Sequence, residues 1–206
     1  MARTDAPQGA ARSRWTLVGV GVLFVAPALL AWVAFQTRNL WWSGVTGNYG
    51  ELITPARPVQ LAGLQTYDRE PLDWTSLRGR WTLVILATQP GDASCLQSLY
   101  TTRQVRTALE RNQGRVQRLL VLEKLPAPAV RGELGRIDPD LIVTVAPGES
   151  LARIRRELAP GTGSAGEGSV YLVDPLGNLM MHYPAGADGK RMLKDLRRLL
   201  KVSQIG

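Results

Sequence analysis

The sequence has very few of the residues that build disulfide or metal frameworks. Among its 206 residues there are one cysteine, Cys95, and one histidine, His182. A single cysteine excludes a disulfide framework within the chain, and one cysteine with one histidine excludes the common types of zinc finger. Charged residues make up only 20% of the chain and hydrophobic residues 45%, close to the globular average. This composition excludes a disordered tail, a collagen-like chain and a coiled coil.

The apolar residues are concentrated near the N-terminus. The run from Trp15 to Phe35 contains 21 residues without a charge, and a helix of that length spans about 31 Å, enough for a bilayer core of roughly 30 Å. It is longer than the apolar part of a cleaved signal peptide and lacks a small-residue cleavage site. Tryptophans flank it, as at membrane interfaces, at positions Trp15, Trp32, Trp41 and Trp42. We therefore predict an uncleaved transmembrane helix over residues 15–36.

Basic residues predict the orientation of this helix. Three arginines precede it and one follows closely, namely Arg3, Arg12, Arg14 and Arg38. The positive-inside rule places residues 1–14 in the cytoplasm and the rest across the membrane. The chain is then a single-pass protein of a bacterial inner membrane, with a connector and lead-in segment over 37–75 and a periplasmic domain over 76–206. Residues 39–206 carry a formal charge of +5, less than the +8 of the whole chain.

The pattern from residue 81 onward predicts alternating strands and helices. WTLVILAT (81–88) and VQRLLVLEK (116–124) are short apolar runs typical of strands covered on both faces. Between them, apolar residues at helical spacing predict a helix that begins near Cys95. This order is a βαβ unit with a parallel strand pair.

The C-terminal part of the pattern completes a sheet. LIVTV (141–145) is a short strand or a lead-in to the helix SLARIRREL (150–158), and 169–175 with 179–184 form a β-hairpin. The final segment, KRMLKDLRRLLKV, is an amphipathic helix. The order predicts an α/β fold with a thioredoxin-like sheet flanked by helices, after one N-terminal transmembrane helix.

Cys95 has two interpretations. It opens the first long helix after a buried strand, where backbone N–H groups and the helix dipole favour a thiolate, so a lowered pKa and a reactive thiol are expected. It also lies on the apolar stripe of that helix, and a free cysteine often packs as a small hydrophobic residue. The sequence leaves both readings open.

Several segments resemble one family. GSVYLVDPLGNLMMHYPAGADGKRMLKDLRRLLKVSQIG, together with NYGELI, RGRWTLVILAT and LYTTRQVRTAL, is similar to bacterial membrane-anchored proteins associated with cytochrome c oxidase biogenesis. These are distant relatives of the Sco/SenC copper chaperones. The resemblance implies a thioredoxin-like domain that faces the periplasm near the site of heme-copper oxidase assembly.

The resemblance also implies a copper site whose residues are missing here. Sco-type proteins bind copper through a C-x-x-x-C loop and a distant histidine, and those positions correspond to Gly91, Cys95 and Gly166. A C-x-x-x-C disulfide cycle is impossible with one sulfur, and a lone thiolate holds Cu(I) only with other ligands. Met180 and His182 could supply them, because both are expected on one face of the second hairpin strand. The alternative to a metal site is that His182 is an ordinary strand residue and Met180 a core residue.

Two groups of basic residues remain. One lies along or just after the first long helix, at Arg103, Arg106, Arg111, Arg115 and Arg118, and the other lies on the final helix. The expected topology and the lack of stacking aromatics exclude nucleic acid. Anionic headgroups, an acidic partner or simple solvation of the helix faces are the alternatives.

These observations predict a non-enzymatic, membrane-tethered accessory factor with a degenerate Sco-like site. It assists cytochrome c oxidase assembly through contacts with oxidase subunits or assembly factors, on a face near residues 90–106 and 161–169. It needs no cofactor. The alternatives are a single-thiol redox or copper(I)-handling protein that uses Cys95, and an anchored interaction module unrelated to respiration.

Overall fold

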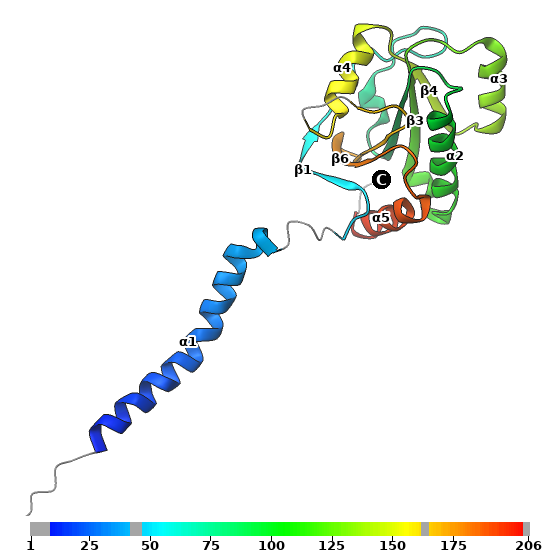
Figure 1. Cartoon of the computed structure of the whole chain (residues 1–206). Helices are drawn as coiled ribbons and strands as arrows, with labels where there is room; N and C mark the ends of the chain where they lie inside the picture. The colour runs from blue at the N-terminus through cyan, green and yellow to red at the C-terminus, as the bar shows by residue number, and fades with distance from the viewer. Residues whose placement is uncertain (1–8, 42–46, 162–164, 204–206) are drawn as a thin grey trace, which may run out of the picture. The chain divides into compact units, whose positions relative to one another are not determined.

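The N-terminal part of the chain is one long helix. The computed structural model describes residues 9–41, 47–161 and 165–203, and the chain divides into two compact units, Met1–Gly47 and Asn48–Gly206 (Figure 1). Helix α1 (Gly9–Trp41) contains Gly19–Thr37, a 19-residue stretch of mean hydropathy 1.9, none of which is buried. Its length and composition are those of a membrane anchor or a signal segment.

The second unit is a six-stranded mixed sheet with flanking helices. The strands are β1 (Glu51–Pro58), β2 (Trp81–Ala87), β3 (Val116–Leu122), β4 (Leu141–Val145), β5 (Val170–Val173) and β6 (Asn178–Tyr183), in the order β1-β6-β5-β2-β3-β4. The helices are η1 (Trp74–Leu77), α2 (Ala93–Thr107), η2 (Glu110–Arg115), α3 (Pro128–Ile137), α4 (Glu149–Leu158) and α5 (Gly189–Val202). Strands β2, β3 and β4 are parallel, and β5, β6 and β1 pair antiparallel. The predicted α/β class, the βαβ unit and the hairpin are confirmed.

The sheet separates two apolar cores. Because side chains alternate along a strand, Leu83 and Ile85 of β2 face the core formed with α2 and α5, while Val84 and Leu86 face the core formed with η1 and α4. All seven residues of β2 are buried, which explains its continuous apolar sequence. Figure 1 shows α2 and α5 together on one side and α4 on the other.

Two parts of the fold differ from the sequence-based expectation, and a third resolves an alternative that the sequence left open. Residues 51–58 lie in the expected connector but form the edge strand β1, paired antiparallel with β6. LIVTV is a strand, β4, which resolves the alternative left open for it. Helix α3 was not expected, since it begins after a proline-rich segment and buries none of its residues.

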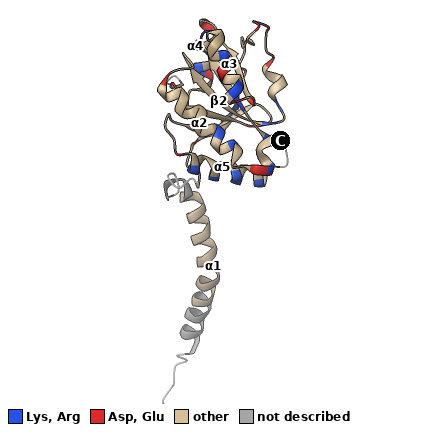
Figure 2. Ribbon diagram, turned by 90° about the vertical axis from the view of Figure 1, so that its right-hand side faces the viewer, with Lys and Arg blue, Asp and Glu red and all other residues tan. Residues whose placement is uncertain are grey.

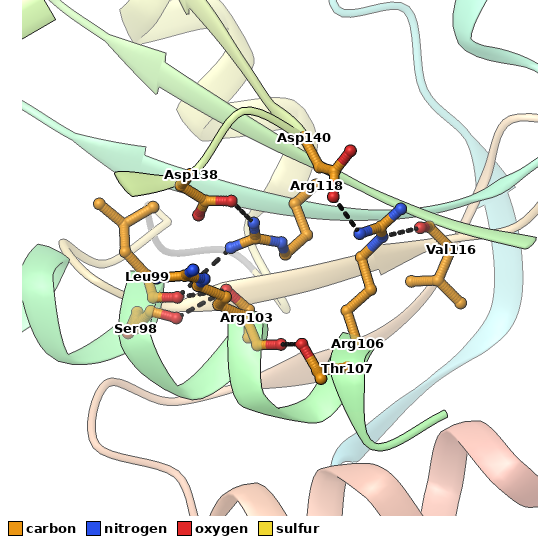
Figure 3. Close-up of polar contacts among 10 residues, drawn as sticks. Ser98, Leu99, Arg103, Arg106, Thr107, Val116, Arg118, Asp138 and Asp140 are labelled. Atoms are coloured by element: carbon orange, nitrogen blue, oxygen red, sulfur yellow. Dashed lines mark hydrogen bonds and ion pairs between the residues drawn. The ribbon is translucent and has the colours of Figure 1, made fainter. Parts of the chain in front are cut away.

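The first group of arginines is largely structural. Arg118 of β3 is 1% exposed and pairs with Asp138, while Arg106 of α2 donates to the carbonyl of Val116 and to Asp140 at 2.8 Å (Figure 3). Arg115 donates to the carbonyls of Leu200 and Ser203 at the end of α5. This corrects the interpretation of the group as one basic face, because three of its five members bind the protein itself.

Candidate functional site

Cys95 lies where the sequence placed it, at the start of the first helix after a buried strand. Strand β2 ends at Ala87, the chain turns, and α2 begins at Ala93. The Cys95 side chain is 0% exposed and belongs to the core between the sheet, α2 and α5. The packing interpretation of this residue therefore describes its environment.

The expectation of a lowered thiol pKa is wrong. Burial, and to a smaller extent the carboxylates of Asp92 and Glu167, together raise the pKa of Cys95 to about 11. A thiolate would have to form in an apolar core close to two negative charges, so the helix dipole does not dominate. The thiol is protonated at neutral pH and is poorly suited to act as a nucleophile or a metal ligand.

The loop before β5 closes directly on the start of α2. A Cβ atom on Gly168, which has a φ of +67°, would lie 2.7 Å from the Cβ of Ser94 and 2.8 Å from its carbonyl carbon. The hydroxyl of Ser98 donates to the carbonyl of Gly168, and the amide of Gly168 donates to the carbonyl of Leu86 at 3.1 Å. Only a glycine permits this approach of two backbones.

A polar cluster of Thr88, Arg155 and Glu167, here called the Glu167 cluster, holds the same loop. The amide and hydroxyl of Thr88 donate to the Glu167 carboxylate at 3.0 and 2.6 Å, and Arg155 pairs with that carboxylate. Arg155 also donates to the carbonyl of Ala165 at 3.0 Å. Although burial opposes it, bonds from Thr88 and Arg155 hold the pKa of Glu167 below its usual value. The cluster joins the residue that follows β2, helix α4 and the loop.

Sequence reasoning missed the Glu167 cluster because no local spacing marks it. Its three residues come from three separate elements, and Glu167 stands in a glycine-rich stretch that suggests only a loop. Three residues of the docking segment expected over 161–169, at 162–164, lie outside the described residues.

Both positions that correspond to missing copper ligands are exposed glycines. A Cβ on Gly91 would meet no atom within 4 Å, so a side chain would fit there without strain. The amide of Gly166 donates to the Tyr171 hydroxyl at 3.0 Å, and its backbone lies beside Ser169. Neither position offers a ligand atom from a side chain.

The structure does not bring Cys95, Met180 and His182 together. A bulge in β6 between the pairs Leu172–Met181 and Val173–Leu179 interrupts the alternation of side chains. Met180 packs against the α2–α5 core, whereas the His182 ring stacks on Tyr171, which belongs to the opposite core. The expected placement of Met180 and His182 on one face is therefore wrong.

The remaining contact of His182 also points away from Cys95. Its Nδ1 lies 3.2 Å from the carboxylate of Glu51 on β1. Within the described part of the chain there is no group of three or more His, Cys, Asp or Glu side chains able to hold a metal ion. The described residues do not fit copper, because the thiol is buried and protonated and the histidine belongs to the other face of the sheet.

Comparison with solved structures shows which known proteins share this fold. The structure resembles apo Sco1 from Thermus thermophilus, with a TM-score of 0.61, 17% identity, and coverage of 74% of this chain and 96% of that chain. It also resembles yeast Sco1 with copper bound (TM-score 0.58, 16% identity, 72% and 91% coverage). A third match is BsSco, described as a member of the Sco family of cytochrome c oxidase assembly proteins (TM-score 0.52, 13% identity, 77% and 99% coverage). At such identities the likeness concerns the fold, which is thioredoxin-like as predicted.

Comparison of sequences identifies the family. A search of curated proteins finds no match. Residues 81–203, more than half of the chain, match the sequence model described as transmembrane-like, thioredoxin-like, C-terminal domain. That description agrees with the apolar helix α1 and with the α/β unit that follows it. The chain therefore belongs to the transmembrane-like, thioredoxin-like family.

Proposed function

We propose that this chain is a membrane-anchored accessory factor in cytochrome c oxidase assembly, and that it acts through protein contacts rather than by catalysis or copper transfer. The fold is shared with Sco proteins, one of which is described as a cytochrome c oxidase assembly protein. The apolar helix α1 supplies an anchor.

One observation carries the choice of protein contacts over chemistry. The region that corresponds to a Sco copper site is closed by the packing of Gly168 on Ser94 and by the Glu167 cluster. Its only sulfur is buried, with a raised pKa. Such a site holds the surface of α2 in place but leaves no thiolate accessible to a substrate.

The surface of α2 offers a docking site within the expected segment 90–106. Leu96 and Tyr100, one helical turn apart, are 50% and 64% exposed. Next to them a groove of about 350 Å³ between α2 and α5 is lined in part by Val105 and Leu193. Exposed aromatic and aliphatic side chains beside a groove are typical anchors of a protein interface, and we assign this surface to the oxidase subunit or assembly factor.

Affinity purification from membranes tests the proposal. We expect oxidase subunits or assembly factors to co-purify with the full-length wild-type protein and with Cys95→Ala. They should be lost with the double variant Leu96→Ser/Tyr100→Ser, while the control Val130→Ser/Leu176→Ser, which alters exposed apolar residues elsewhere, retains them. Far-UV circular dichroism verifies that each variant is folded.

Two results would overturn this function. If no oxidase subunit or assembly factor co-purifies with the wild type, the link to oxidase assembly fails. If stoichiometric copper is present in the wild type and absent from Cys95→Ala, the protein handles copper through its thiol.

We also propose that the folded unit Asn48–Gly206 lies in the bacterial periplasm and that α1 remains attached. Arg3, Arg12 and Arg14 before the apolar stretch support this orientation. Alkaline phosphatase fused after Gly206 should be active, and green fluorescent protein fused there and exported by the same route should be dark. The reverse pair of results places the folded unit in the cytoplasm.

A further inference from the structure

Helix α5 presents a continuous basic face. Its exposed basic residues are Lys190, Arg191, Lys194, Arg197, Arg198 and Lys201. At 100° per residue they fall within about a third of the circumference of the helix, opposite Met192, Leu196 and Leu200, which are buried in the core. Figure 2 shows the basic residues along the outer side of α5.

The carboxylate of α5 points inward and does not neutralise this face. Asp195 is 1% exposed and accepts hydrogen bonds from the amides of Tyr49 and Gly50, each at 2.9 Å, and from the Tyr183 hydroxyl at 3.2 Å. The nearby Asp188 is the N-cap of the helix and accepts from the amide of Lys190. A carboxylate oxygen of Asp188 also lies 3.9 Å from Nε of Arg191, an exposed pair that offsets at most one of the six cations, so the basic face keeps most of its positive charge.

The same contacts fix the beginning of the folded unit to α5. A Cβ atom on Gly50 would lie 2.6 Å from side-chain atoms of Met181 and Tyr183, so this segment fits closely against the sheet. The Tyr49 ring, 52% exposed, lies beneath the cations of Arg191 and Lys194, at 5.4 and 5.5 Å. The chain that arrives from α1 therefore reaches the folded unit at the basic face.

Chain length limits how far this face lies from a membrane that holds α1. The apolar stretch ends at Thr37 and Tyr49 follows 12 residues later, so even a fully extended chain separates them by roughly 40 Å at most. A tether of this length keeps the bilayer surface at an effective concentration in the millimolar range. At this effective concentration, a weak attraction between the basic face and the bilayer surface is sufficient for docking.

We propose that the basic face of α5 docks on the anionic headgroups of the bilayer in which α1 is inserted. Clustered Lys and Arg residues next to a membrane span are the usual means of binding anionic lipid. The aromatic residue at the edge of the face, Tyr49, is of the type that settles at headgroup level. A protein interface would require apolar anchors, and on the described part of α5 the large apolar residue that is well exposed is Val202 at the C-terminal end. The inference rests on the anchoring part of the proposed function and not on its link to the oxidase.

Quenching of a fluorophore by lipid in nanodiscs tests this docking. The full-length protein carrying Cys95→Ala and Val202→Cys is labelled with an environment-sensitive fluorophore and reconstituted with a headgroup-nitroxide lipid. The discs contain phosphatidylcholine alone or with about a third phosphatidylglycerol. A label at Glu149→Cys on α4, which covers the opposite face of the sheet, serves as the reference. We expect quenching at position 202 to exceed that at 149 in anionic discs and to fall in neutral discs and at high salt.

Charge variants identify the docking residues. Replacing Lys190, Lys194, Arg197 and Lys201 by Gln should lower the ratio of docked to free protein at least about tenfold. The matched control replaces four exposed basic residues outside α5, Arg80, Lys124, Arg136 and Arg156, by Gln, and should retain docking. Near-UV circular dichroism shows that both variants keep the wild-type packing.

Three outcomes would overturn the inference. The first is equal quenching at position 202 in neutral and anionic discs, and the second is an equal loss in the two charge variants. The third is a loss of a co-purifying protein from the α5 variant with lipid quenching unchanged, which assigns the face to an acidic protein instead. Incorporation into discs tests the anchor separately, and co-purification of the oxidase tests the proposed function separately.

Discussion

The buried pair of Arg118 and Asp138 gives the sharpest test of how α2 is held. The Arg118 side chain is 1% exposed and the Asp138 side chain 9%. Apart from that carboxylate, the guanidinium has a 3.4 Å contact from Nη1 to the carbonyl of Leu99, and its Nε has no partner among the described residues. Asp138→Ala leaves a buried cation almost without compensation, so we expect a loss of about 3–5 kcal/mol in the free energy of unfolding.

The neighbouring pair of Arg106 and Asp140 supplies the control. Asp140 is 62% exposed, so Asp140→Ala should cost no more than about 1 kcal/mol. Urea unfolding of the full-length protein in a non-ionic detergent, followed by near-UV circular dichroism, measures both values. The melting temperature of Asp138→Ala should fall by roughly 10 °C. Equal losses in the two variants would refute the reasoning, because they would mean that water solvates Arg118 in the folded state.

A second way of removing the pair separates charge burial from packing. The double variant Arg118→Met/Asp138→Leu replaces both charges by apolar side chains. Replacement of a buried pair in this way is often neutral or stabilising, so the double variant should be more stable than Asp138→Ala. If it is equally unstable, the loss comes from altered packing of α3 against the sheet rather than from an unpaired charge.

Three further predictions concern the closed site. Gly168→Ala should lower the free energy of unfolding by about 2–4 kcal/mol, because the added Cβ meets the backbone of Ser94 at a position of positive φ. The control Gly91→Ala places its Cβ in open space and should change that free energy by no more than about 0.5 kcal/mol. Equal losses in the two variants would contradict the close approach of Gly168 to Ser94. At pH 8, Cys95 should react with a disulfide reagent at least about 100-fold more slowly in the native protein than in the protein unfolded in guanidinium. The reason is that a pKa of about 11 lowers the thiolate fraction about 200-fold from that of a free cysteine. Comparable rates in the two states would mean that the native thiol is accessible. The lowered pKa of Glu167 means that its stabilisation is present above the unfolded-state pKa and is lost as pH falls through the folded-state pKa. The stability advantage of the wild type over Glu167→Gln should therefore be largest near pH 7 and shrink in acid, and a difference independent of pH contradicts it.

The fold could be predicted where one local pattern determines one element. The strand at 81–87 is buried on both faces and the hairpin has a clear turn, so apolar runs and turn residues were sufficient. The helix at the C-terminus was equally clear, because its apolar and basic residues separate onto opposite faces. Strand β1 was missed since it is a mostly exposed edge strand, with two prolines and no apolar alternation.

The position of the candidate site could be predicted from the sequence, but the pKa of its cysteine and the partners of its charged residues could not. The position of Cys95 follows from the order of a strand and a helix, which local sequence shows. Its pKa depends first on burial in the core between the sheet, α2 and α5, and also on Glu167, 72 positions away. In the same way, Arg118 reads as part of a basic surface until its partner Asp138 is known. Pairings between distant segments leave no periodic signal in one sequence.

The balance of forces at Cys95 explains why one helix start can carry different chemistry in proteins of the same fold. A helix N-terminus stabilises a nearby anion by about 1 kcal/mol at most at ordinary sites, and that effect requires the anion to exist. Here the loop with Gly168 excludes water from the side of α2, and Glu167 adds a negative charge that is itself stabilised by Arg155. Arg155 therefore neutralises a carboxylate rather than supporting a thiolate. The bonds of Arg155 to Glu167 and to the carbonyl of Ala165 hold the loop closed against the start of α2, which is the rigid surface that the proposed function requires.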